Sequence, residues 1–108
     1  MPKLIYIAGP YRGATINETV HNIQRAREAA EAVAKAGHYF FCPHLNSALV
    51  DGLMPDSFWL DMDLELLRRC DAIYMMHGWE SSAGARKERV VAEGWGKEII
   101  LDLAELKL

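Results

Sequence analysis

Short apolar runs alternate with longer amphipathic segments along the whole chain. The short runs end at glycine, proline or polar residues and have the length of β-strands. They cover residues 4–8, 38–42, 72–76 and 98–101. The longer segments have apolar residues at every third or fourth position, which predicts helices. They cover residues 15–36, 56–69 and 83–95.

Capping residues support the ends of these helices. Thr15 is followed three residues later by Glu18, which is the pattern of a capping box, and Gly37 stands where the first helix should end. Asp56 is a plausible N-cap of the second helix. Residues 45–55 contain several turn-forming residues and predict a loop with room for one helical turn.

Strands that are separated by helices require crossover connections and therefore a parallel sheet. Right-handed crossovers place the helices on both faces of the sheet. We therefore expect an α/β fold: a single small domain over residues 1–108, a Rossmann-like or flavodoxin-like three-layer sandwich with a four- or five-stranded, mainly parallel sheet. Ligands of such sheets bind beyond the carboxyl ends of the strands. This rule selects the loops 9–14, 43–55 and 77–85.

Two carboxylates interrupt the apolar faces of the predicted helices. Asp63 falls within the arc formed by Trp59, Met62, Leu66, Leu67 and Cys70, and Glu88 is central to the face that holds Gly84, Ala85, Val91, Ala92 and Trp95. An ionised carboxylate on such a face costs several kcal/mol unless it is paired, and such groups often mark functional sites. Each acid could also form a structural pair with an arginine or a helix cap. Two carboxylates beside one cleft favour glycosidic chemistry.

Other residues near the strand ends are candidate ligand contacts. The segment Gly9-Pro10-Tyr11-Arg12-Gly13 matches neither a dinucleotide fingerprint nor a P-loop, but Arg12 could hold a phosphate or be an ordinary turn arginine. Ser81 and Ser82 could bind an anion, and one of them should cap the third helix. The small residues around Gly84 leave space for a ligand at that helix N-terminus. Tyr6 could orient a carboxylate or bond to the backbone.

Composition excludes several classes of protein. The chain has 12 Lys+Arg and 15 Asp+Glu residues, a formal net charge of −3, which argues against a duplex nucleic-acid binder. No apolar run is long enough for a membrane span and no secretory signal is visible, so we expect a cytoplasmic protein. We then expect Cys42 and Cys70 to be reduced core thiols, with a disulfide as the lesser alternative. The histidines lack zinc-site spacing, and we expect neither a metal nor another cofactor.

Three segments together resemble the nucleoside 2-deoxyribosyltransferase superfamily, which includes the 2'-deoxynucleoside 5'-phosphate N-hydrolases. They are Ile5-Tyr6-Ile7-Ala8-Gly9-Pro10-Tyr11-Arg12-Gly13, Asp63-Leu64-Glu65-Leu66-Leu67 running into Cys70-Asp71-Ala72, and Ser81-Ser82-Ala83-Gly84-Ala85-Arg86-Lys87-Glu88. The resemblance implies that Glu88 is the nucleophile, that Asp63 assists at the departing base and that Tyr6 positions Glu88. It also implies sugar or phosphate contacts from the loops. The candidates are Gly9, Tyr11, Arg12, Gly13, Ser81, Ser82 and Gly84.

The chain departs from this superfamily at several positions. Pro10 stands where the hydrolase branch has a serine, and Arg86-Lys87 is bulkier than the usual pair before the nucleophile. Family members often complete their site with residues of a neighbouring subunit, so we expect a homodimer or higher homo-oligomer. Trp59, Trp79 and Trp95 are plausible interface anchors.

The leading hypothesis is N-glycosidic bond cleavage or transfer on a nucleoside or nucleoside 5'-monophosphate, through a glycosyl-enzyme intermediate on Glu88. The alternatives are a protein that binds the same small molecule without turnover, and an interaction domain in which Asp63 and Glu88 are structural.

Overall fold

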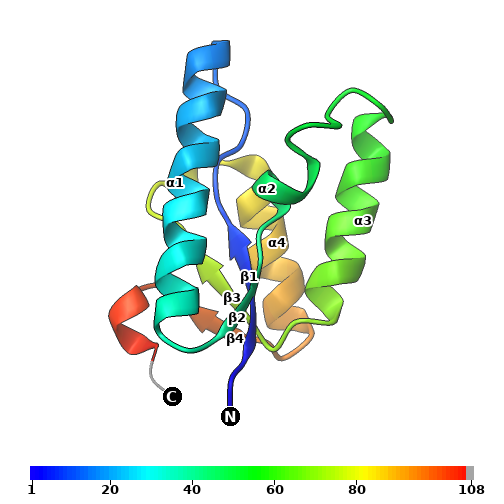
Figure 1. Ribbon diagram of the computed structural model, residues 1–108. Coiled ribbons are helices and arrows are strands. Elements are labelled where there is room, and N and C mark those ends of the chain that lie inside the picture. Colours follow the sequence, from blue (N-terminus) through cyan, green and yellow to red (C-terminus); the bar gives the residue numbers. More distant parts are fainter. Residues whose placement is uncertain (107–108) are drawn as a thin grey trace.

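A parallel four-stranded sheet forms the centre of the molecule (Figure 1). The structure is a computed structural model that describes residues 1–106. The strands are β1 (Leu4–Ala8), β2 (Tyr39–Phe41), β3 (Ala72–Met75) and β4 (Glu98–Ile100), in the spatial order β2-β1-β3-β4. All neighbouring strands are parallel, which confirms the expected fold class.

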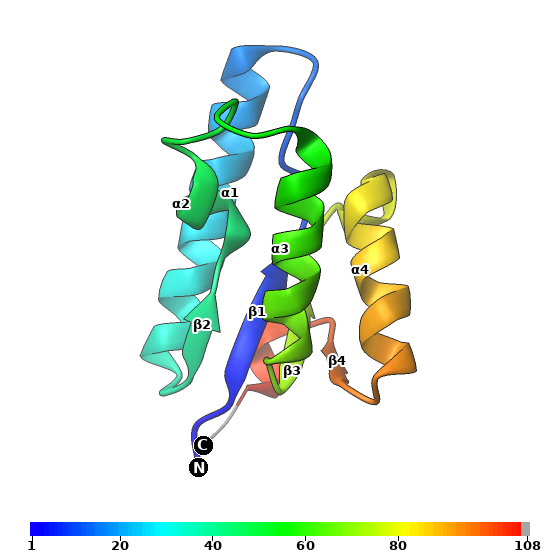
Figure 2. The same ribbon diagram turned by 90° about the vertical axis from the view of Figure 1, so that its right-hand side faces the viewer.

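Helices cover both faces of this sheet. They are α1 (Ile16–Lys35), the short α2 (Pro43–Ser47), α3 (Asp56–Arg68) and α4 (Ala83–Gly94), with 3₁₀ turns η1 (Trp79–Ser81) and η2 (Leu103–Glu105). Helix α1 lies on one face, and α3 and α4 lie together on the other (Figures 1 and 2). Because the chain moves outward to β2 and then back past β1 to β3, right-handed crossovers must place α1 and α3 on opposite faces.

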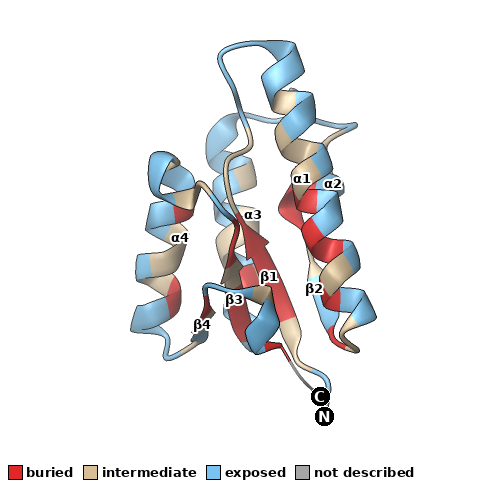
Figure 3. Cartoon of the chain, turned by 90° about the vertical axis from the view of Figure 1, so that its left-hand side faces the viewer, coloured by how far each residue is buried: buried red, intermediate tan, exposed pale blue. Residues whose placement is uncertain are grey.

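The two faces of β1 belong to different parts of the core. Ile5 and Ile7 pack against α1, whereas Tyr6 and Ala8 face the layer formed by α3 and α4. This alternation follows from the period of two along a strand. All four side chains are buried, and Figure 3 shows that the most buried elements are the central strands. The order of apolar residues in β1 therefore decides that Tyr6 faces α4.

Most helix ends agree with the sequence analysis. The Thr15 hydroxyl accepts a hydrogen bond from the Glu18 amide at 3.1 Å, while the Glu18 carboxylate accepts one from the Ala14 amide at 2.5 Å. The expected cap at Asp56 is wrong: Pro55 occupies the N-cap position of α3 without a side-chain bond. Pro43 ends β2 as expected but also begins α2, because proline fits the first turn of a helix.

Helix α4 is one residue shorter than expected, and this changes the position of Trp95. Trp95 is the C-cap of α4 and is 44% exposed, so its expected place on the inward face is wrong. Cys42 and Cys70 are buried free thiols. Within residues 1–106, no helix is long and apolar enough to span a membrane.

Candidate functional site

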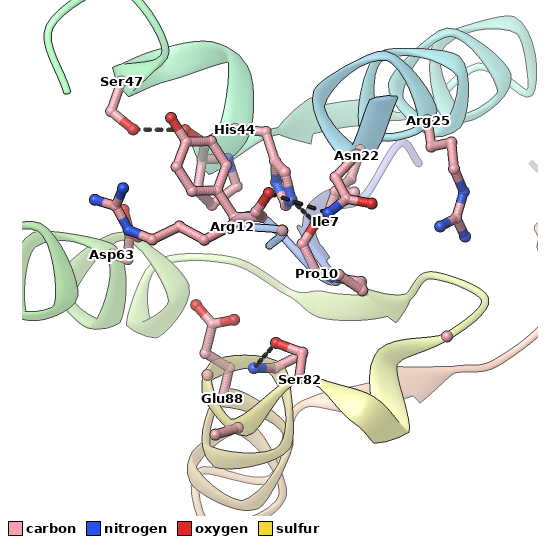
Figure 4. Close-up of a pocket in the computed structure, with 18 of the residues that line it drawn as sticks. Ile7, Pro10, Arg12, Asn22, Arg25, His44, Ser47, Asp63, Ser82 and Glu88 are labelled. Carbon is pink, nitrogen blue, oxygen red and sulfur yellow. Dashed lines mark hydrogen bonds between the residues drawn. The ribbon is translucent and has the colours of Figure 1, made fainter. Parts of the chain in front are cut away.

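A cavity of about 850 Å³ opens at the carboxyl ends of β1 and β3, where the strand order reverses. Its walls come from α1, α2, α3 and α4, from the loop after β1 and from the segment before α4 (Figure 4). This is the position at which open parallel sheets bind ligands. Each of the three loops selected from the sequence contributes residues to the wall.

Glu88 and Asp63 line this cavity from neighbouring helices on the same face of the sheet. Figure 4 shows Asp63 on α3 and Glu88 on α4, with the Glu88 carboxylate directed into the open space. Neither acid appears among the ion pairs of the described residues. A structural pair with an arginine, the simplest alternative explanation for both acids, is therefore not what the structure shows.

Burial raises the pKa values of both carboxyl groups toward neutral pH. It raises the pKa of Glu88 from 4.5 to about 7; the hydrogen bond from Tyr6 lowers this pKa and the charge of Asp63 raises it. Burial raises the pKa of Asp63 from 3.8 to about 6. Near pH 7 both groups can therefore exchange protons, which general acid–base chemistry requires.

Tyr6 reaches Glu88 from the central strand of the sheet. Its hydroxyl donates a hydrogen bond to Oε2 of Glu88, and its ring is completely buried beneath α4. Burial, followed by the charges of Glu88 and Asp63, raises the pKa of the phenol well above 10, so that it stays protonated and remains a donor. The alternative considered from the sequence, a bond from this hydroxyl to the backbone, is not the contact found.

Two glycines allow the loop after β1 to pack closely. A Cβ at position 9 would lie 2.6 Å from Sδ of Met76, and one at position 13 would lie 2.2 Å from Cβ of Glu18. Both glycines line the cavity, but packing within the chain already explains why larger residues are excluded.

Arg12 also lies at the cavity, but its guanidinium is held by two acids. Nη2 of Arg12 is 3.0 Å from Asp51 and 3.2 Å from Asp56. The hydroxyl of the neighbouring Tyr11 donates to Asp51 at 3.4 Å. The sequence analysis selected neither acid as a site residue: Asp56 was considered only as a helix cap, and Asp51 lies in a segment whose composition indicated only a loop.

The N-terminus of α4 borders the cavity through Ser81, Ser82 and Gly84. Ser82 is the N-cap: its hydroxyl accepts a hydrogen bond from the Ala85 amide at 3.2 Å. The hydroxyl of Ser81 donates to the Gly78 carbonyl at 2.8 Å. The expected cap is thus present, and a Cβ at Gly84 would meet nothing closer than 4.0 Å, which leaves space beside the helix end.

Two residues that the sequence analysis did not select as site residues hold the loop after β1 in place. Nε2 of His44 is 2.8 Å from the Pro10 carbonyl, and Nδ2 of Asn22 donates to the Tyr11 carbonyl at 3.1 Å (Figure 4). His44 is buried, which lowers its pKa from 6.5. The ring therefore favours its neutral form, with Nε2–H as the donor. For His44, the only signal in the sequence was the dipeptide Pro43-His44 after an apolar strand. That dipeptide does not specify which group the histidine contacts.

No group of three or more His, Cys, Asp or Glu side chains within residues 1–106 is arranged to hold a metal ion. The polar side chains that line the cavity carry carboxyl, hydroxyl, guanidinium, imidazole and amide groups.

A solved structure with a similar fold is that of the 2-deoxyribosyltransferase of the psychrotolerant bacterium Bacillus psychrosaccharolyticus. The TM-score is 0.67 at 20% sequence identity, over 94% of this chain and 78% of that one. That enzyme is described as a biocatalyst for the synthesis of antiviral and antitumoral nucleosides. At this identity the likeness establishes the fold. None of the curated proteins matches the sequence. Residues 3–101 match the family described as a domain of unknown function, DUF4406, and the chain therefore belongs to that family.

Proposed function

We propose that the protein is an enzyme of nucleoside metabolism that cleaves or transfers an N-glycosidic bond. The observation that carries this proposal is Glu88: its carboxylate forms no ion pair with an arginine within residues 1–106, is held by the Tyr6 hydroxyl and is open to a cavity that it shares with Asp63. The fold shared with a 2-deoxyribosyltransferase supports the same conclusion. The proposed substrate is a nucleoside or a nucleoside 5'-monophosphate.

In the proposed reaction, ionised Glu88 attacks the anomeric carbon of the sugar. A bond forms between its oxygen and that carbon while the bond from the carbon to the base nitrogen breaks, and the bonding electrons leave with the base. Protonated Asp63 supplies the proton that the departing base requires and is left as a carboxylate, which accepts the proton of the attacking water or second base in the next step. Water or a second base then attacks the same carbon and releases Glu88, which gives hydrolysis or transfer respectively.

Tyr6 is proposed to position the nucleophile. Because its hydroxyl binds one carboxylate oxygen, it fixes the orientation of the group and leaves the other oxygen, Oε1, for the sugar. The donor also favours the ionised form of Glu88, which is the reactive form. Tyr6 does not line the cavity itself, so we assign it a positioning role.

The polar end of the substrate is proposed to bind along the loop after β1 and the N-terminus of α4. The candidate contacts are Gly9, Tyr11, Arg12, Gly13, Ser81, Ser82 and Gly84, all of which line the cavity. Backbone amides at a helix N-terminus suit sugar hydroxyls and anions alike.

Release of free base from nucleosides and nucleotides tests this function. The native protein, incubated with a panel of both, should liberate base that is measurable by chromatography. Glu88→Gln should abolish release while retaining the circular dichroism spectrum. Glu93→Gln is the matched control, because Glu93 lies on the same helix, exposed and outside the cavity.

Two outcomes would contradict the proposal. Turnover that is unchanged in Glu88→Gln would remove Glu88 from the mechanism. Saturable binding of these ligands by the native protein without any base release would instead support a non-catalytic binding protein that uses the same cavity.

We also propose that a second copy of the chain is a partner. Exposed apolar side chains gather between α2 and the first turns of α3, in the segment 45–60, and this segment borders the cavity. They are Leu45, Leu49, Val50, Leu53, Met54, Phe58 and Leu60. A patch of this kind is typical of an interface. Of the tryptophans expected as anchors, Trp79 packs instead against the core, with the Arg89 guanidinium 4.8 Å from its ring centre.

A further inference from the structure

Three charged side chains form a cluster in the wall of the cavity. Arg12, from the loop after β1, meets Asp51, from the segment before α3, and Asp56, from the first turn of α3. Both acids approach the same nitrogen, Nη2, at 3.0 and 3.2 Å. All three residues line the cavity, so the cluster belongs to the site in which the substrate is proposed to bind.

We propose that Asp51 and Asp56 are specificity-determining residues: by occupying the guanidinium of Arg12 and keeping this part of the cavity lining negative, they make the site select uncharged nucleosides over nucleoside 5'-monophosphates. This inference rests on the proposed function and decides between the two substrate classes that it leaves open.

The cluster has one positive and two negative charges, and its net charge is therefore negative. A phosphate that approached Arg12 would have to displace the two carboxylates or come close to them. Displacement would lose two charge-assisted contacts, and proximity would place like charges together. A sugar hydroxyl meets neither obstacle, because it can donate to either carboxylate.

The charge of the whole cavity lining, with the cluster included, is also negative. Among the lining residues, the acids other than Asp63 and Glu88 outnumber the arginines. These acids are Glu18, Asp51 and Asp56, and the arginines are Arg12 and Arg25. The excess of negative charge therefore holds whether Asp63 and Glu88 are protonated or ionised. A dianionic phosphate gains no net attraction from such a lining.

Arg25 is the cation that a phosphate would otherwise use. Its Nη2 donates to the His77 carbonyl at 2.5 Å, and it contacts no carboxylate among the ion pairs of residues 1–106. Figure 4 places it on the side of the cavity away from Asp63 and Glu88. The guanidinium of Arg25 is thus already bonded to the backbone, and the charge of Glu18 offsets its charge within the lining.

The two acids differ in exposure, which predicts that they contribute unequally to the preference for nucleosides over monophosphates. The Asp51 side chain is 27% exposed, whereas that of Asp56 is 77% exposed. Because water and salt screen the more exposed charge, Asp51 should discriminate more strongly. Asp51→Asn and Asp56→Asn are thus matched variants. Each makes the same substitution beside Arg12, but the substituted side chains differ in exposure.

The test is calorimetric binding of ligand pairs that differ only in the phosphate: each common 2'-deoxynucleoside and its 5'-monophosphate. Heat of binding is measured with the native protein and with Glu88→Gln, in which turnover is prevented. We expect the nucleoside to bind at least about tenfold more tightly than its monophosphate. Asp51→Asn should reduce this preference by about tenfold, and Asp56→Asn by about threefold or less.

Two further variants identify the origin of the effect. Asp51→Asn alone should increase the affinity for the monophosphate, because it frees the guanidinium of Arg12. Arg12→Gln combined with Asp51→Asn should remove this increase. Asp61→Asn is the control, since Asp61 is exposed on α3 outside the cavity and removes the same charge. It should leave the ratio of the two affinities unchanged.

The outcomes separate this inference from the proposed function. Equal or tighter binding of the monophosphate by the native protein overturns the inference alone, as does a ratio that Asp51→Asn leaves unchanged. Binding of neither ligand overturns the proposed function and, with it, this inference.

Discussion

The hydroxyl of Tyr6 donates a hydrogen bond to the carboxylate of Glu88, although the two residues are 82 positions apart in the chain. One belongs to the central strand and the other to α4, which packs over it. The contact is made inside the protein, where a hydrogen bond to a charged group is strong and a charged group without a hydrogen-bond partner is costly. It couples the position of the proposed nucleophile to the rigid sheet.

Tyr6→Phe should lower kcat for base release by about tenfold or more, since Glu88 loses its orienting donor. The pH dependence should change as well. Because the hydrogen bond lowers the pKa of Glu88, its loss should raise that pKa above about 7 and move the acidic limb of the rate profile to higher pH. The measurement is kcat as a function of pH.

Tyr74→Phe serves as the control for Tyr6→Phe. Tyr74 also lies on a central strand, but it packs on the α1 side of the sheet, away from Glu88. Removal of the Tyr74 hydroxyl should leave the pH dependence of kcat unchanged. A profile that shifts equally in both variants would contradict a specific role for Tyr6.

The raised pKa of Glu88 makes stability depend on pH. The carboxyl group has a pKa of about 7 in the folded protein and near 4.5 when exposed, so between these values the folded state binds more protons. The free energy of unfolding should therefore fall as pH rises from about 4 to about 7. Glu88→Gln should lack the part of this fall that Glu88 causes and keep the part that Asp63 causes, because the pKa of Asp63 is also raised. The variant should be more stable than the native protein by about 3 kcal/mol above pH 7 and nearly equal below pH 4.

Urea unfolding across this pH range measures the effect. A constant difference between the native protein and Glu88→Gln at every pH would mean that Glu88 titrates normally and that the cavity does not perturb it.

The Ser82 cap should contribute measurably to stability. Ser82→Ala removes the hydroxyl that accepts from the Ala85 amide, and this should lower the free energy of unfolding by about 1 kcal/mol. Ser81→Ala is the matched control: its hydroxyl only donates to the Gly78 carbonyl at an exposed turn, so the loss should be smaller. Chemical denaturation of the two variants compares them. Equal losses would contradict the assignment of the cap to Ser82.

Self-association should depend on the exposed apolar segment 45–60. Light scattering at micromolar concentration should give a mass of at least twice the 12.2 kDa chain, and Leu49→Ser with Leu53→Ser should shift it toward the monomer. Val90→Ser is the control, because Val90 is an isolated exposed side chain on α4. A native protein that is monomeric under these conditions would contradict the proposed partner.

Much of the fold followed from the order of apolar and polar residues. The alternation of strands and helices predicted the parallel sheet and its two helical layers, because a short strand can be continued in parallel only by a crossover. The helix boundaries were predicted to within about two residues, since capping residues act locally. Trp95 was placed wrongly because periodicity does not show which residue ends the last turn.

The candidate site was only partly predictable. Glu88 and Asp63 could be found because charge on an apolar helix face is visible in the spacing of residues, and both line the cavity. Asp51, Asp56 and His44 could not be found in this way. They lie in or at the edge of a segment without clear periodicity, and their significance depends on which backbone and side-chain groups the loop after β1 brings to them.

The sequence by itself determined the elements, their parallel arrangement and the two acids directed toward the sheet, because these depend on contacts between near neighbours and on the periodicity of each element. Only the tertiary structure decided that Tyr6 binds Glu88 and that Arg12 is held by Asp51 and Asp56. Such contacts join segments that are distant in the chain. Which partner a polar group meets depends on the packing of whole helices against the sheet, and residue spacing carries no information about that choice.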